Sequence, residues 1–165
     1  MQTWFECKVK YRKIDQNGKE HTVNESYLVD AISFTDTEAR IIDELATIVR
    51  GEFTVTDIRK SKISEVFPHE GGEWWFRVAI NLTTIDEDAG KEKKLRSFYL
   101  VQADDVKEAV RLTEENLSFL IVPYVVTSIA VSNIIDVFPY IPQQKIPDNY
   151  ILIARDESAG EQDEA

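Results

Sequence analysis

The sequence predicts an α+β fold built from two copies of a ββαβ unit, with six main strands, two helices and a pseudo-twofold axis. Three observations predict it: the chain repeats itself, each copy opens with alternating apolar and polar residues, and each copy continues with a helix-start signal. Period-two alternation is typical of a strand with one buried face. One helix on one small sheet leaves a thin core, so we expect one cooperative domain rather than two.

The duplication consists of matches that keep the same order along the chain. The segment WFECKVKYRKIDQ (4–16) matches WFRVAINLTTIDE (75–87), and VTDIRKSKISEVFP (55–68) matches VTSIAVSNIIDVFP (126–139). One matched pair of segments could arise by chance, but a series of matches in the same order indicates an internal duplication. The matches predict repeat 1 over about residues 3–68 and repeat 2 over about residues 74–139.

Each repeat is expected to begin with a β-hairpin. In repeat 1, Phe5, Cys7 and Val9 alternate with charged residues, which places them on one buried face. Asn17-Gly18 is a strong hairpin-turn signal, and Asp88-Ala89-Gly90 is a longer version of it in repeat 2.

A helix and a long third strand are expected to complete each repeat. Thr35 with Glu38, and Asp105 with Glu108, have the spacing of a capping box at a helix start. The third strand is expected to run unbroken over residues 53–67 and 124–138, and a proline follows each of these segments.

The C-terminal part of the chain lies outside the duplication. Residues 140–153 are expected to dock on the body as an arm, which gives a single domain over residues 1–153. Residues 154–165 are acidic and lack large apolar side chains, so they are expected to be a disordered tail. Such a tail tunes a nucleic-acid contact, recruits a partner, or only maintains solubility.

Composition and charge exclude several classes of protein. The chain has 30 acidic and 19 basic residues, a net charge of −11, which argues against coating duplex DNA or anionic lipid by charge alone. The single cysteine, Cys7, excludes a disulfide framework and fits a reducing cytosol. Neither a signal peptide nor a membrane-spanning apolar run is recognisable, so we expect a cytoplasmic protein with no membrane partner.

No motif for catalysis or metal binding is present. The sequence has no zinc-ligand spacing of cysteines and histidines and no glycine-rich phosphate loop. We therefore expect a protein that is not an enzyme, with no catalytic residue, no metal and no cofactor. An enzyme with an unrecognised site is a third interpretation, which a deep pocket holding His21 or His69 beside carboxylates would favour.

Aromatic and basic residues share the outward face predicted for the first strand. Trp4 has the same parity as Lys8, Lys10 and Arg12. Aromatic residues among bases on a sheet surface are typical of single-stranded nucleic-acid binding. In the alternative, Trp4 and Trp75 only fill the contact between the repeats. The predicted nucleic-acid-binding residues are Trp4, Lys8, Lys10, Arg12, Arg59, Lys60, Lys62, Trp75 and Arg77.

Several segments resemble an uncharacterised family, the domain of unknown function numbered 4494, of Bacteroidetes bacteria and their phages and prophages. The segments that carry the resemblance are Trp4–Tyr11, Tyr27–Ala31, Glu38–Ile42, Gly51–Val55 and Asp136–Tyr140. The resemblance implies a cytosolic protein with a phage or mobile-element connection, and it brings no catalytic residue.

Two functional hypotheses follow from these observations. The first is a non-enzymatic phage or prophage accessory protein that binds single-stranded DNA or RNA in DNA metabolism. The second is a protein–protein interaction module that binds a host or phage protein, or an inhibitor of a host protein that acts as an acidic decoy of nucleic acid. The sequence leaves the ligand and the oligomeric state open.

Overall fold

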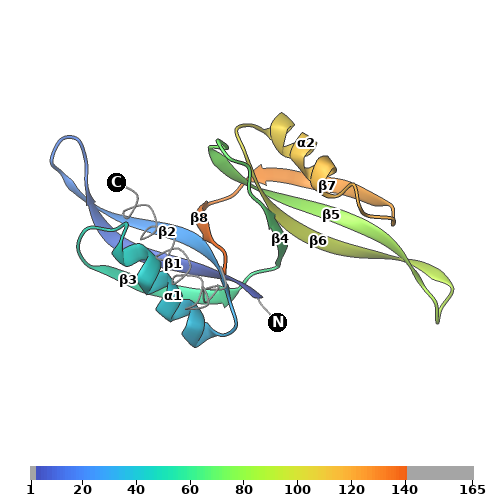
Figure 1. The fold of residues 1–165 in the computed structure, drawn as a ribbon, viewed down its shortest axis with the longest axis horizontal. Coiled ribbons are helices and arrows are strands. Elements are labelled where there is room, and N and C mark those ends of the chain that lie inside the picture. Colours follow the sequence, from blue (N-terminus) through green and yellow to red (C-terminus); the bar gives the residue numbers. More distant parts are fainter. Residues whose placement is uncertain (1–2, 141–165) are drawn as a thin grey trace, which may run out of the picture.

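The computed structural model describes residues 3–140, which form two four-stranded sheets, each with one helix on one face (Figure 1). Sheet A has the strand order β3-β1-β2-β8, and sheet B has the order β4-β6-β5-β7. The elements are β1 (Thr3–Ile14), β2 (Glu20–Ala31), α1 (Phe34–Ala46), β3 (Phe53–Lys60), β4 (Ile63–Phe67), β5 (Trp74–Asp86), β6 (Lys91–Ala103), α2 (Val106–Asn116), β7 (Tyr124–Val131) and β8 (Ile134–Phe138). The expected tail (154–165), and the expected arm apart from Tyr140, lie outside the described residues.

The two repeats exchange their last strands. The α+β class is confirmed, but the described residues form eight strands, not six. Strand β4 of repeat 1 pairs in parallel with β6 of repeat 2, and β8 of repeat 2 pairs in parallel with β2 of repeat 1. Both sheets therefore have equivalent strand orders, and each takes its fourth strand from the other repeat (Figure 1).

A serine turn divides each third strand, so the prediction of an unbroken strand is wrong. Ile63 N donates to Ser61 Oγ at 3.2 Å, and Ile134 N donates to Ser132 Oγ at 3.1 Å. A serine side chain that accepts from the backbone two residues ahead stabilises a bend. This bend directs the rest of the segment to the other sheet.

The helix starts follow local capping. Asp105 is the N-cap of α2 and accepts from Glu108 N at 2.8 Å, as the spacing predicts. The N-cap of α1 is Ser33, which accepts from Asp36 N at 3.0 Å. The predicted start at Thr35 is therefore two residues too late, because Ser33 is itself a preferred N-cap residue.

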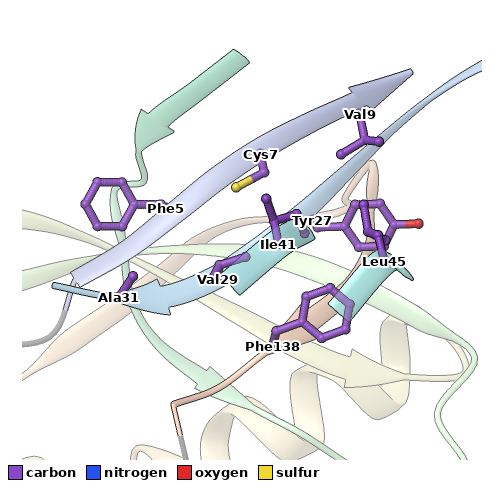
Figure 2. Packing of buried hydrophobic residues seen from close by; sticks show 9 residues of the cluster. All are labelled: Phe5, Cys7, Val9, Tyr27, Val29, Ala31, Ile41, Leu45 and Phe138. Carbon is purple, nitrogen blue, oxygen red and sulfur yellow. The ribbon is translucent and has the colours of Figure 1, made fainter. Parts of the chain in front are cut away.

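Each sheet has a compact core under its helix, and each core includes a residue from the other repeat. Phe138 of β8 stacks on Tyr27 at 5.6 Å between ring centroids, and Phe67 of β4 stacks on Tyr99 at 5.3 Å. Figure 2 shows the buried cluster under α1, which comprises Phe5, Cys7, Val9, Tyr27, Val29, Ala31, Ile41, Leu45 and Phe138.

A third cluster joins the two sheets through the faces that carry no helix, the helix-free faces. Its members are Leu28, Trp75, Leu100 and Ile134, with Trp4, Ile63, Val66 and Val137 packed against them. Trp4 and Trp75 bring the first residues of β1 and β5 into this contact. The tips of the β1–β2 and β5–β6 hairpins lie at opposite ends of the described residues, away from this contact (Figure 1).

The thiol of Cys7 is enclosed in the sheet A core. Burial, with smaller contributions from Glu6 and Asp57, raises its pKa to about 12. Because the unfolded thiol ionises near pH 9 and the folded one does not, this group's contribution to stability is present below pH 9 and is lost as pH rises toward 12.

We therefore expect Cys7 to react with a disulfide reagent at pH 8 only after unfolding. Above pH 9 the free energy of unfolding should fall more steeply for the native protein than for Cys7→Ala, as measured by urea denaturation. Tyr11 and Tyr27 also have raised pKa values, and comparison with Cys7→Ala separates their contributions. Rapid labelling of the folded protein would contradict the assignment.

Candidate nucleic-acid interface

The helix-free face of sheet A carries the predicted lysines and arginines of β1. Lys8, Lys10 and Arg12 lie opposite Ser26, Asn24 and Thr22 of β2. Acidic residues oppose most of this positive charge. The closest contacts are Arg59 to Glu6 at 3.3 Å and Arg12 to Glu20 at 3.5 Å, and Lys8 lies opposite Asp57 in the strand register.

The structure gathers only some of the other predicted residues on this face. Arg59 lies there beside Glu6. Lys60 is in register with Phe5, whose side chain belongs to the core under α1, so Lys60 lies on the helix-covered side at the sheet edge. Lys62 lies in the connection between β3 and β4.

The two tryptophans pack in the contact between the sheets. Trp75 is only 8% exposed, and Trp4 is half-buried against the same cluster. This arrangement agrees with the alternative that Trp4 and Trp75 fill the contact between the repeats. Trp75 is therefore too enclosed to stack a nucleic-acid base.

The helix-free face of sheet B holds an aromatic ring flanked by two arginines. The guanidinium carbon of Arg77 lies 4.5 Å from the centroid of the Phe98 ring, and that of Arg96 lies 5.2 Å from it. Phe98 is half-buried, and both arginines are exposed. Lys94 lies on the same face, opposite Thr83 of β5.

Sequence reasoning found Arg77 but missed Phe98, Arg96 and Lys94. These three alternate along β6 and lie opposite Ala79, Asn81 and Thr83 of β5. Their alternation in the segment KLRSF (94–98) was the available signal. Only the register of β6 against β5 shows that Phe98, Arg96 and Lys94 share a face with Arg77.

The stretch of this face that runs from Lys94 to Leu100 carries positive charge and no acidic residue. From Lys94 to Leu100, the helix-free positions of β6 and of the neighbouring β5 and β7 carry no aspartate or glutamate. Glu92 lies on this face one position nearer the hairpin tip, opposite Ile85. Within residues 3–140, neither Arg77 nor Arg96 forms an ion pair. Sheet B therefore has the positive face that is less neutralised, although sequence reasoning favoured sheet A.

A cavity of about 320 Å³ lies next to this surface, between the two sheets. Glu6 and Arg77, which occupy equivalent positions in the two repeats, both line it, as do the equivalent pair Leu28 and Leu100. A broader hollow of about 920 Å³ on sheet A is lined by charges of both signs, including Arg12 and Glu52.

The two histidines lie in local structural contacts. His21 Nε2 is hydrogen-bonded to Asp15 Oδ2 at 2.7 Å, and this bond is the main reason that the pKa of Asp15 is lowered. His69 Nε2 lies 3.6 Å from Glu108 Oε1. Neither histidine lines the two hollows described above.

Across residues 3–140, no three or more histidine, cysteine, aspartate or glutamate side chains gather in a way that would hold a metal ion. Over the same range, neither helix has the length and apolar character needed to cross a membrane.

Comparisons with known proteins give one match, to a family. No curated protein and no solved structure matches the chain. The model of a family described as a domain of unknown function matches residues 3–140, which are all the residues that the structure describes. The chain therefore belongs to this family, DUF4494.

Proposed function

We propose that this protein is a non-enzymatic, cytoplasmic accessory protein of phage or prophage DNA metabolism that binds single-stranded nucleic acid on the helix-free face of sheet B. The observation that carries the proposal is the Arg77–Phe98–Arg96 cluster on a helix-free sheet face, where neither arginine forms an ion pair within residues 3–140. Single strands bind to such faces by stacking bases on aromatic rings or guanidinium planes and by pairing phosphates with cations.

The distribution of charge also favours a single strand over a duplex. The whole chain has a net charge of −11, which repels a densely charged duplex. On sheet B, however, Lys94, Arg96 and Arg77 follow one another from near the hairpin tip toward the contact between the sheets. A flexible strand can follow this row while it stays clear of the acidic surfaces.

The test is the affinity of the full chain for labelled single-stranded DNA and RNA, measured by fluorescence anisotropy over a range of salt concentrations. In Arg77→Gln/Arg96→Gln, we expect affinity to fall about tenfold or more for each lost charge-assisted contact. The slope of log affinity against log salt should decrease by about 0.7 for each phosphate contact removed. Phe98→Leu should weaken binding without changing that slope.

The matched control is Arg111→Gln on α2, whose side chain pairs with Glu115 at 2.8 Å away from the proposed site. It should leave affinity unchanged. Loss of binding in Lys8→Gln/Lys10→Gln, with normal binding by the sheet B variant, would move the site to sheet A. Absence of binding at low salt would overturn the proposal.

A further inference from the structure

Strand β7 is an edge of sheet B, and it carries no charged residue. Its equivalent in repeat 1, β3, is also a sheet edge. Every charged position in residues 50–62 is uncharged in the equivalent residues 121–133. The replacements are Arg50 by Ile121, Glu52 by Pro123, Asp57 by Ser128, Arg59 by Ala130, Lys60 by Val131 and Lys62 by Asn133.

This difference matters because charged residues on edge strands prevent pairing with another chain. Strand β3 has that protection, and β7 does not. The neighbouring side chains increase the contrast, because Val125 is 64% exposed and Ile121 in the preceding loop is fully exposed. Phe119 and Val131 are exposed as well. The equivalent edge strands β3 and β7 therefore differ in charge, the property that prevents an edge from pairing with another chain.

The geometry points to a second copy of this chain as the occupant of the β7 edge, and we propose that two β7 strands pair antiparallel about a twofold axis. In the register that we propose for this pair, Tyr124 lies opposite Val131 of the second copy, Val125 opposite Ala130, and Val126 opposite Ile129. The axis then passes between Thr127 and Ser128. Opposed residues must lie on the same face of a sheet, and this register meets that condition at each of these pairs.

The faces follow from the pairing of β7 with β5. Tyr124, Val126, Ile129 and Val131 lie opposite core residues of β5, whereas Val125 and Ala130 lie opposite Asn81 and Arg77 on the helix-free face. The β-bulge near Thr127 shifts the alternation of side chains between the two faces by one residue at the centre of β7. Because of this shift, opposed residues of two antiparallel β7 strands lie on the same face on both sides of the bulge. An uncharged edge also places no like charges opposite each other across the axis.

Such a dimer would continue sheet B into an eight-stranded sheet. It would align the helix-free faces of both copies on one side, with the two Arg77–Phe98–Arg96 clusters flanking the join. The dimer does not depend on nucleic-acid binding, and its test contains no nucleic acid.

The test is sedimentation velocity of the full 165-residue chain over a wide range of concentration. We expect a monomer–dimer equilibrium, with the dimer at twice 19.0 kDa. Val125→Glu should raise the dimer dissociation constant about a hundredfold, since it places a charge at the join. The matched control is Thr54→Glu, which introduces glutamate at the equivalent position of β3 and should leave the dimer intact.

A second variant guards against misfolding. Ser128→Asp/Ala130→Arg/Val131→Lys gives β7 the residues that β3 holds at the same positions, and circular dichroism should show a normal fold. It should be monomeric. A native chain that stays monomeric at its highest attainable concentration would overturn the proposal, as would a dimer that survives in this variant or is lost equally in Thr54→Glu.

Discussion

Repeat 1 with part of the connection that follows it, residues 3–72, is expected not to fold as a monomer but to fold only as a dimer that exchanges β4. In the whole chain, β2 is flanked by β8 of the other repeat, which supplies Phe138 to the core. Without it, Tyr27 loses its stacked partner and one edge of the sheet A core is open. A single repeat also has a thin core for its size.

Strand β4 cannot fill that place within the same repeat. From β3, it would have to pass β1 and β2, three inter-strand steps or about 14 Å. The connection through Ser61 and Lys62 joins Lys60 to Ile63 and spans at most about 11 Å. The exchange therefore needs a second unit, which the whole chain supplies as repeat 2.

The measurement is circular dichroism together with sedimentation equilibrium of residues 3–72 over a range of concentration. The folded signal should rise with concentration and should follow the dimer, since such a protein has no stable folded monomer. Addition of residues 73–140 should increase the folded signal further by supplying β8. A monomer that unfolds cooperatively at low concentration would contradict the exchange geometry.

Much of the local structure could be predicted, because short-range signals determine it. The alternation of Phe5, Cys7 and Val9 marks the buried face of β1, and these residues do lie in the core under α1. The Asn17-Gly18 turn lies in the β1–β2 connection, with Gly18 at a φ of 78°. Asp105 caps α2 as its spacing predicts.

The exchange of strands could not be predicted in the same way. Residues 53–67 and 124–138 read as single β-rich segments, and a serine within such a segment is ordinary. The backbone N–H of Ser61 donates to Trp4 O at 2.8 Å, and that of Ser132 donates to Trp75 O at 2.7 Å. Each serine Oγ then accepts from the backbone N–H two residues ahead, which makes the turn. These bonds depend on the register of the whole sheet.

The candidate site shows the same limit. Arg77 was recognised from its place in the first strand of repeat 2, but its neighbours come from β6. Whether Phe98 and Arg96 share its face depends on the hairpin register, in which Phe98 lies opposite Ala79. The tryptophans were ambiguous for another reason, because recurrence at equivalent positions is expected both of a binding surface and of a contact between repeats.

Trp75→Ala is expected to lower the free energy of unfolding by about 3–5 kcal/mol, the usual cost of removing a large buried aromatic side chain. Trp75 packs with Leu28 and Leu100 at the contact between the two sheets, where only 8% of its surface is exposed. Its neighbour Trp74 is 50% exposed and provides a matched control. Trp74→Ala should change stability by about 0.5 kcal/mol or less, as at most surface sites.

Urea denaturation of both variants, followed by anisotropy with single-stranded DNA where each is folded, separates packing from binding. If Trp75 holds the sheets together, its removal destabilises the protein and affects binding only as far as it displaces Arg77, two residues along β5. Unchanged stability with a large loss of affinity would instead make Trp75 a binding residue. That result would also require the two sheets to separate when nucleic acid binds, because the indole is enclosed between them.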